Sequence, residues 1–144
     1  MQKTNLTKQK IEELRADAIK RAIERAKNRK QAIIDCFTNL KPIPDKDHIP
    51  MLPMCDKETY DNVVVPNLIR CGAIPIDKLV VGKTYIGDCR NASEAVWNGK
   101  RFVYERHKFG DVFEEEINHF QEDNGYDLFV PIKVKEDDTE TQNN

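Results

Sequence analysis

The chain has 144 residues, of which 39% are hydrophobic and 33% are charged, and this composition suits a small domain with an extended appendage. Its net charge of −2 divides into +5 over residues 1–40, +2 over 41–110 and −9 over 111–144, which argues against a continuous positive surface for a nucleic-acid polymer. No segment has the roughly 20 apolar residues of a membrane span or the apolar stretch of a signal peptide, so we expect a cytoplasmic protein without membrane attachment.

Residues 1–40 are predicted to be a helical oligomerisation segment. Between Leu6 and Leu40 the sequence contains neither Gly nor Pro, which predicts one long helix, or two helices with a short break, with a thin apolar stripe along one side. The stripe consists of Ile11, Leu14, Ala18, Ala22, Ala26, Ile33 and Phe37. A helix of about 35 residues extends roughly 50 Å, which is longer than the following domain can cover. We therefore expect it to pack against a second copy of itself.

Residues 41–56 are predicted to be a linker, because their four prolines forbid a continuing helix and hold the chain extended. The apolar residues between the prolines indicate that this linker lies against a surface. Asp56 then offers an N-cap for a short second helix, which we expect to run to Arg70 with Gly72 in the C-terminal stop position. Pro66 is expected to split or kink that helix.

Residues 57–134 are predicted to form a small α+β domain, because the apolar period changes from helical to strand-like after Pro75. The expected strands cover residues 83–89, 92–97, 100–108, 112–119 and 126–134. Asn98-Gly99 is the strongest hairpin signal, since both residues accept the positive φ of a type I′ turn. We therefore expect the helices to be followed by a four- to five-stranded antiparallel sheet. Residues 135–144 are acidic and free of apolar side chains, which predicts a disordered tail.

Aromatic and cationic side chains alternate in the third expected strand. Alternation places Phe102, Tyr104 and Arg106 on one face. A nucleotide site needs such a combination, because a base stacks on a ring or a guanidinium while a second cation meets phosphate. The alternative is a half-exposed strand whose cationic side chains cover the rings. Trp97 is likewise either a stacking platform or simply the largest core residue.

The run from Asp88 to Ser93 is dense in polar donors and acceptors, among them the Arg90 guanidinium and the Asn91 amide. Such a turn can cradle an anion or recognise a base edge, although an Asx-type turn at the end of a strand has a similar composition. The fourth expected strand adds one more amide. The candidate ligand-binding residues are therefore Arg90, Asn91, Trp97, Phe102, Tyr104, Arg106 and Asn118.

Two histidines suggest an enzymatic alternative. His107 in the third strand and His119 in the fourth would suit a general acid/base pair, together with a neighbouring glutamate, if they converged on one face of the sheet. The result would be a small metal-independent phosphodiesterase or lyase. The four cysteines lack the paired spacing of zinc sites and no established catalytic signature occurs, so we expect no metal, no cofactor and no catalysis. A third possibility is a non-enzymatic, oligomeric protein-interaction module.

A family resemblance is carried by two runs, GKTYIGDCRNASEAVWNGKRFVYERHKFG and INHFQEDNGYDLFVP. Over about residues 79–134 the chain resembles phage anti-Thoeris proteins of the first type, which sequester the cyclic ADP-ribose signals made by bacterial TIR enzymes. This resemblance implies an immune-evasion protein that binds a small cyclic nucleotide in the host cytoplasm and releases it intact. It also implies a homo-oligomer built from dimers with ligand pockets at subunit boundaries, and some members of that family hold cyclic di- or trinucleotides.

Overall fold

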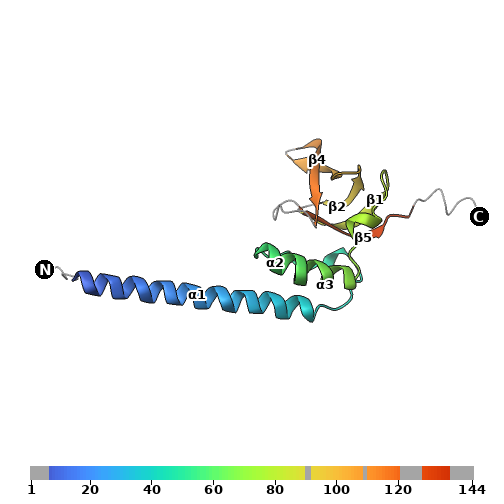
Figure 1. Cartoon of the computed structure of the whole chain (residues 1–144). Coiled ribbons are helices and arrows are strands. Elements are labelled where there is room, and N and C mark those ends of the chain that lie inside the picture. Colours follow the sequence, from blue (N-terminus) through green and yellow to red (C-terminus); the bar gives the residue numbers. More distant parts are fainter. Residues whose placement is uncertain (1–6, 90–91, 109, 121–127, 137–144) are drawn as a thin grey trace, which may run out of the picture.

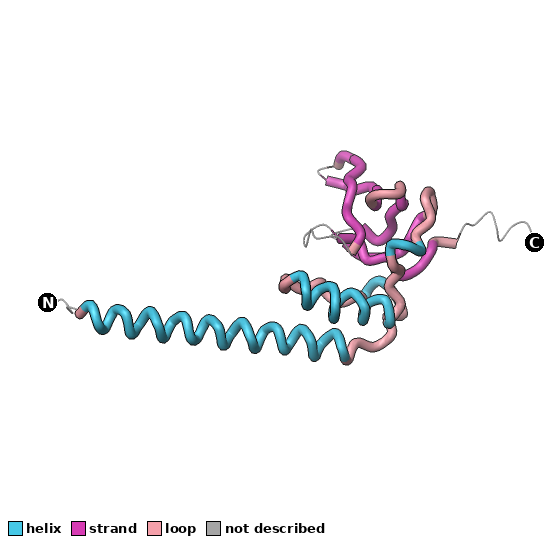
Figure 2. The backbone as a smooth tube through the Cα atoms, in the orientation of Figure 1, coloured by secondary structure: helices cyan, strands magenta, loops and turns pink. Residues whose placement is uncertain are grey.

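The computed structural model describes residues 7–89, 92–108, 110–120 and 128–136, with the backbone alone for 106–108. A long helix is followed by a short second helical stretch and a five-stranded sheet, which is the α+β fold that the sequence predicts. The second stretch lies between the long helix and the strands, and the N-terminal part of the long helix extends away from both (Figures 1 and 2). Within the described residues, no helix combines the length and apolar character that crossing a membrane requires.

Helix α1 (Lys8–Thr38) is continuous, which is the first of the two predicted arrangements. It begins after Thr7, whose hydroxyl oxygen accepts a hydrogen bond at 3.2 Å from the backbone N–H three positions later. Its C-terminal end is tied to the body of the protein by Arg70, whose guanidinium donates to the Leu40 carbonyl oxygen at 3.0 Å. Across the whole described length of α1, Phe37 is the one buried residue. The helix therefore contacts the body at one end and projects from it at the other.

The second helical stretch combines α2 (Lys57–Thr59), a π turn (Tyr60–Val64) and α3 (Val65–Arg70). Asp56 caps its start as predicted, because the carboxylate accepts hydrogen bonds from the Thr59 backbone N–H at 3.1 Å and from the Thr59 hydroxyl at 2.7 Å. Gly72 follows its end with a φ of 124°, a conformation that favours glycine. Pro66 was predicted to split or kink this helix, and the α-helical pattern is interrupted just before it: the π turn ends at Val64 and α3 begins at Val65. The wider π turn accommodates a proline ring that has no N–H to donate.

The strands are β1 (Thr84–Cys89), β2 (Ala92–Trp97), β3 (Phe102–Lys108), β4 (Asp111–His119) and β5 (Leu128–Val134), close to the predicted ranges. Strands β1 to β4 form an antiparallel meander, and β5 pairs antiparallel with β1, which closes the sheet into a barrel. The predicted antiparallel order is correct for every pair but one. Strands β4 and β5 run parallel, because β5 continues in the direction of β4 and overlaps it only at Asn118↔Leu128 and His119↔Phe129. Residue 109, residues 121–127 and the predicted tail from residue 137 onward lie outside the described residues.

Two hydrophobic cores share strand β5. The helical core is made of Phe37, Ile43, Val64, Val65, Leu68, Cys71, Ala73, Phe120, Leu128, Val130 and Ile132. The barrel core is made of Tyr85, Cys89, Ala92, Ala95, Trp97, Phe102, Tyr104, Ile117 and Phe129. Strand β5 supplies both, because successive side chains of a strand point to opposite faces. Its close approach to β1 depends on Gly87, where a Cβ atom would lie 2.2 Å from the Val130 carbonyl oxygen.

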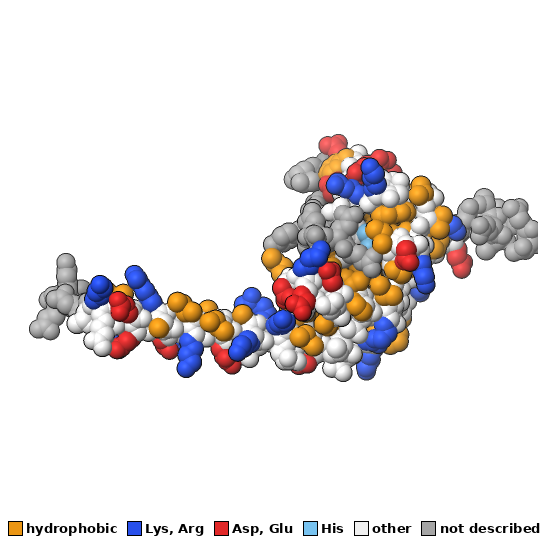
Figure 3. All heavy atoms as spheres, in the orientation of Figure 1, with side chains coloured by type: hydrophobic (Ala, Val, Ile, Leu, Met, Phe, Trp, Pro, Cys, Tyr) orange, Lys and Arg blue, Asp and Glu red, His pale blue; other side chains and the backbone are white. Residues whose placement is uncertain are grey.

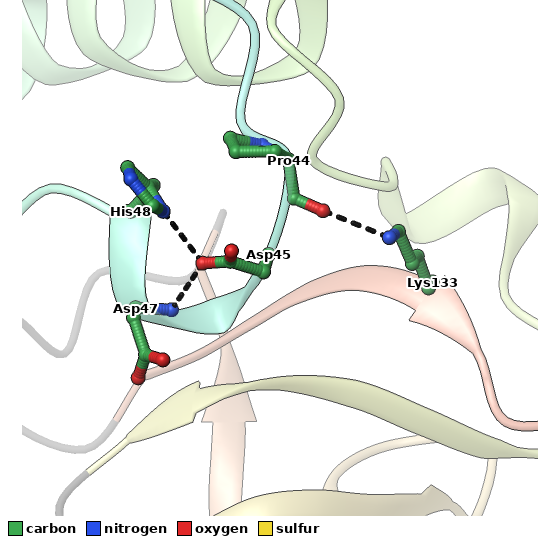
Figure 4. A network of polar contacts seen from close by, with 5 residues as sticks. All are labelled: Pro44, Asp45, Asp47, His48 and Lys133. Carbon is green, nitrogen blue, oxygen red and sulfur yellow. Dashed lines mark hydrogen bonds and ion pairs between the residues drawn. The ribbon is translucent and has the colours of Figure 1, made fainter.

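The linker between α1 and α2 lies against the body, as predicted. Its Pro44 carbonyl oxygen accepts a hydrogen bond from Lys133 Nζ of β5 at 2.8 Å (Figure 4). The Asp45 carboxylate accepts from the Asp47 backbone N–H at 3.0 Å and lies 2.6 Å from His48 Nδ1. The hydrogen bond between these two side chains lowers the pKa of Asp45 and raises the pKa of His48. A local network of polar contacts thus fixes the course of this proline-rich segment.

The β2–β3 hairpin turns one residue later than predicted. Trp97 pairs with Phe102, so the turn is centred on Gly99-Lys100 rather than on Asn98-Gly99. The reason is the side chain of Asn98, whose amide oxygen accepts hydrogen bonds at 2.8 and 2.7 Å from the backbone N–H groups two and three positions later. Gly99 has a φ of 105°, which its missing side chain permits.

Candidate functional site

A cleft opens between strands β2 and β3 of the barrel. The two strands pair only beside their hairpin, at Val96↔Val103 and Trp97↔Phe102, whereas β3 pairs with β4 along all seven of its residues. Beyond that short ladder the strands separate and leave a cavity of about 450 Å³. A volume of this size lies within the range of small-molecule sites, which is roughly 300–1,000 Å³.

Small residues of β2 form one wall of the cleft. This wall contains Ala92, Ser93 and Ala95. Their side chains are too short to fill the space between the separated strands. The pairing of β2 with β1 shifts register between Ile86 and Cys89, and such an irregularity bends the strand that carries it. Strand β2 therefore follows β1 around the barrel instead of staying beside β3.

The described lining of the cleft is acidic. Glu94 of β2, Glu105 of β3 and Glu114 of β4 all border it and are exposed to solvent. Lys135 also borders it, and its Nζ lies 3.1 Å from a carboxylate oxygen of Glu94. The carboxylates outnumber the cations among the described lining residues. An anionic ligand would therefore need further positive charge from outside this set.

The candidate arginines adjoin the two walls in sequence. Arg90 and Asn91 directly precede Ala92, and both lie outside the described residues. Arg106 directly follows Glu105 in β3, where its backbone pairs with Phe113 of β4 and its side chain is outside the described part. The predicted anion-binding role of these residues stays a prediction.

The three candidate aromatic residues are buried. Trp97 and Phe102 expose 4% and 0% of their surface and lie in the barrel core with ring centroids 4.9 Å apart. Neither ring offers an open face for stacking in this structure. Trp97 is therefore a core residue, which is the second of the two predicted possibilities. Tyr104 exposes 4% but borders the cleft, and its hydroxyl donates to a Glu115 carboxylate oxygen at 2.6 Å.

Asn118 is buried elsewhere on the barrel and does not line the cleft. Its side-chain amide oxygen has no hydrogen-bond partner among the described residues. Buried polar atoms of this kind are uncommon in proteins, because they lose hydrogen bonds to water and gain none. Within the described structure, therefore, the candidate set is not gathered at one place, and Tyr104 is the member that borders the cavity.

His119 is fully buried among aromatic rings. Its Nε2–H donates to the Ile74 carbonyl oxygen at 3.0 Å, and its ring stacks on Phe102 with centroids 6.1 Å apart. Burial lowers the pKa of His119 to about 4, so the imidazole is neutral near pH 7. The side chain of His107 lies outside the described part, which leaves the predicted acid/base pair a prediction. Among the described residues, no three or more side chains of the metal-ligating types lie together.

Most of the residues that line the cleft are not among the candidates predicted from the sequence. Ser93 belonged to the polar run that was singled out, but the neighbouring alanines and the glutamates at 105 and 114 were not chosen. Small residues in a strand are the one signal that pointed to open space there. Comparison with protein-family models, with curated proteins and with solved structures gave no match for this chain.

Proposed function

We propose that this protein binds a cyclic nucleotide of the cyclic ADP-ribose type in the β2–β3 cleft and releases it without cleavage. The observation that carries the proposal is the position of a cavity of about 450 Å³ between the strands that adjoin the candidate arginines. One wall begins at Ala92, directly after Arg90 and Asn91, and the other ends at Glu105, directly before Arg106. A ligand seated between these walls would lie within reach of both arginine positions.

Such a ligand suits a site that contains both positively charged side chains and carboxylates. Its pyrophosphate requires cations, which Arg90, Arg106 and Lys135 supply. Its ribose hydroxyls are hydrogen-bond donors, and the carboxylates of Glu105 and Glu114 are acceptors for them. The acidic lining therefore serves the sugar part of the ligand and the arginines serve the phosphates. Binding of this kind needs affinity alone and no poised nucleophile.

Calorimetric titration with cyclic ADP-ribose isomers and with cyclic di- and trinucleotides tests the proposal. Arg106→Ala is expected to weaken binding at least about tenfold, because a hydrogen bond to a charged group contributes roughly 1.5–3 kcal/mol. The matched control is Lys100→Ala, which removes one positive charge from the exposed hairpin turn outside the cleft and should leave affinity unchanged. Mass spectrometry of the ligand after heat release is expected to show its original mass. A hydrolysed product, or binding by none of these ligands, would overturn the proposal.

A protein-interaction module is the second candidate function, and the strand edges of the cleft favour it. Residues 92–95 of β2 lie beyond the two-row ladder to β3, so this edge faces the cavity. An extended peptide can add to such an edge by backbone hydrogen bonds, and Glu94, Glu105 and Glu114 would select a basic one. Titration with a lysine-rich peptide distinguishes the two functions. Peptide binding that is lost in Glu105→Gln, without any nucleotide binding, would favour this second candidate.

A further inference from the structure

The N-terminal half of α1 presents large apolar side chains to solvent. Leu14, Ile19 and Ile23 expose 45%, 62% and 53% of their surface. Hydrophobic side chains lie among charged ones along the projecting part of the helix (Figure 3). Helices in proteins draw most of their stability from the packing of such a face, and the body of this protein covers only the other end of α1.

A shallow apolar groove continues this face toward the body. It has a volume of about 380 Å³ and runs between α1 and the end of the linker. Ile23, Ala26 and Ile33 line it from the helix, and Met54, which exposes 70% of its surface, lines it from the linker. Ile19 and Ile23 lie one turn apart on the side of α1 that this groove continues, whereas Leu14 is nine residues from Ile23 and lies on the opposite side. Ile19, Ile23 and the groove together form one apolar surface along α1. We call it the α1 face.

The charges of α1 are unevenly divided between its two halves. Residues 8–19 carry three basic and three acidic side chains, whereas residues 20–38 carry six basic and two acidic ones. Two parallel helices would place the basic halves against each other, and like charges at that distance repel. Two antiparallel helices would instead place each basic half against the half that holds three carboxylates. The charge distribution therefore selects an antiparallel partner with the same sequence.

We propose that the α1 face is covered by the α1 face of a second copy of this chain, with the two helices antiparallel. The projecting half of each copy then lies along the groove of the other. A pairing centred between Ala22 and Ile23 sets Ile19 of one copy opposite Ala26 of the other, so that a large side chain meets a small one. The projecting halves, which the body leaves uncovered, would each be covered by the partner.

Sedimentation equilibrium of the full chain across micromolar concentrations tests the pairing. The parent chain is expected to dimerise, and Ile23→Glu is expected to raise the dissociation constant at least about tenfold, because it places a charge in an apolar contact. Asn28→Glu is the matched control: it adds the same charge nine residues from Ile19, on the opposite side of the helix, and should leave the dimer intact. Trp97 fluorescence verifies that each variant keeps its barrel core. A monomeric parent chain, or a dimer that Ile23→Glu leaves unchanged, would overturn the proposal.

The orientation of the helices requires a second measurement. In a chain with serine at the exposed Cys36 and the partly buried Cys55, single cysteines are introduced as Ile23→Cys or Ala16→Cys, two positions on the same side of the helix. An antiparallel pair brings the two copies of position 23 together and holds the two copies of position 16 about 20 Å apart, which is too far for a disulfide. Cross-linking at 23 and none at 16 is therefore expected. Equal cross-linking at both positions would show a parallel pair and would reject this orientation.

Discussion

Helix α1 and strand β5 differ in how much of each segment the rest of the protein covers. In the described structure, α1 has 31 residues and buries one of them, whereas β5 has seven residues and buries its first five. The helix is held by its own hydrogen bonds and by contacts at one end. The strand is paired on both sides and contributes to both hydrophobic cores. Changes at β5 should therefore weaken the whole fold, and changes at the start of α1 should affect the helix alone.

The largest effect is expected where β1 and β5 are closest. In Gly87→Ala the new Cβ would lie 2.2 Å from the Val130 carbonyl oxygen and 2.7 Å from the Phe129 ring, so the strands would have to separate. We expect a loss of about 3 kcal/mol or more of unfolding free energy, measured by urea denaturation with Trp97 fluorescence. Gly82→Ala is the control, because it meets no atom within 4 Å and bears only the strain of a positive φ. Equal losses in the two variants would contradict this account of the shared strand.

The second effect is a pH dependence that originates in the barrel core. Burial lowers the pKa of His119 from about 6.5 to about 4, so protonation favours the unfolded chain. The contribution of His119 to stability should be complete above pH 6.5 and should decrease by about 3 kcal/mol as the pH falls to about 4. Urea denaturation between pH 4 and pH 8 measures it. The variant His119→Phe should lose this part of the pH dependence, and an unchanged profile would show that other groups cause it.

The smallest effect is expected at the two N-caps. One begins α1 and the other begins the second helical stretch, so equivalent substitutions compare the projecting helix with the body of the protein. Both Thr7→Ala and Asp56→Ala remove an N-cap, a change that typically costs about 1 kcal/mol. The first should reduce the helical circular dichroism of α1 and leave the Trp97 unfolding midpoint where it is. The second should lower that midpoint, because the second helical stretch packs in the helical core with β5. A shift of the midpoint by Thr7→Ala would mean that α1 is coupled to the body.

Much of this fold follows from local sequence. The Asp56 cap and the Gly72 stop each depend on a side chain and its immediate neighbours, and both stand where the sequence predicted them. The strand ranges agree to within two residues at each end for the same reason. A local error is the hairpin turn, where the Asn98 side chain accepts hydrogen bonds from two backbone N–H groups and moves the turn by one residue.

Contacts between distant segments were harder to predict. The run LFVPI in β5 is continuously apolar, which is the pattern of a strand buried on both faces, but it does not say which elements cover it. The candidate site shows the same difficulty. Alternation correctly grouped Phe102 with Tyr104, yet the sequence cannot tell which face of a strand turns inward when both faces mix polar and apolar residues. The cleft depends on the separation of β2 from β3, which no single segment encodes.

The position of β5 in two cores also governs when the chain can fold during synthesis. Strand β1 begins at Thr84, yet its partner β5 ends at Val134, some 50 residues later along the chain. A ribosome adding roughly 5–20 residues per second takes about 3–10 s to make that stretch. During this interval the apolar faces of the helices and of the first strands stay exposed, because the strand that covers them has not yet been synthesised. Until its fifth strand emerges, the nascent chain exposes apolar surface of the kind that chaperones bind.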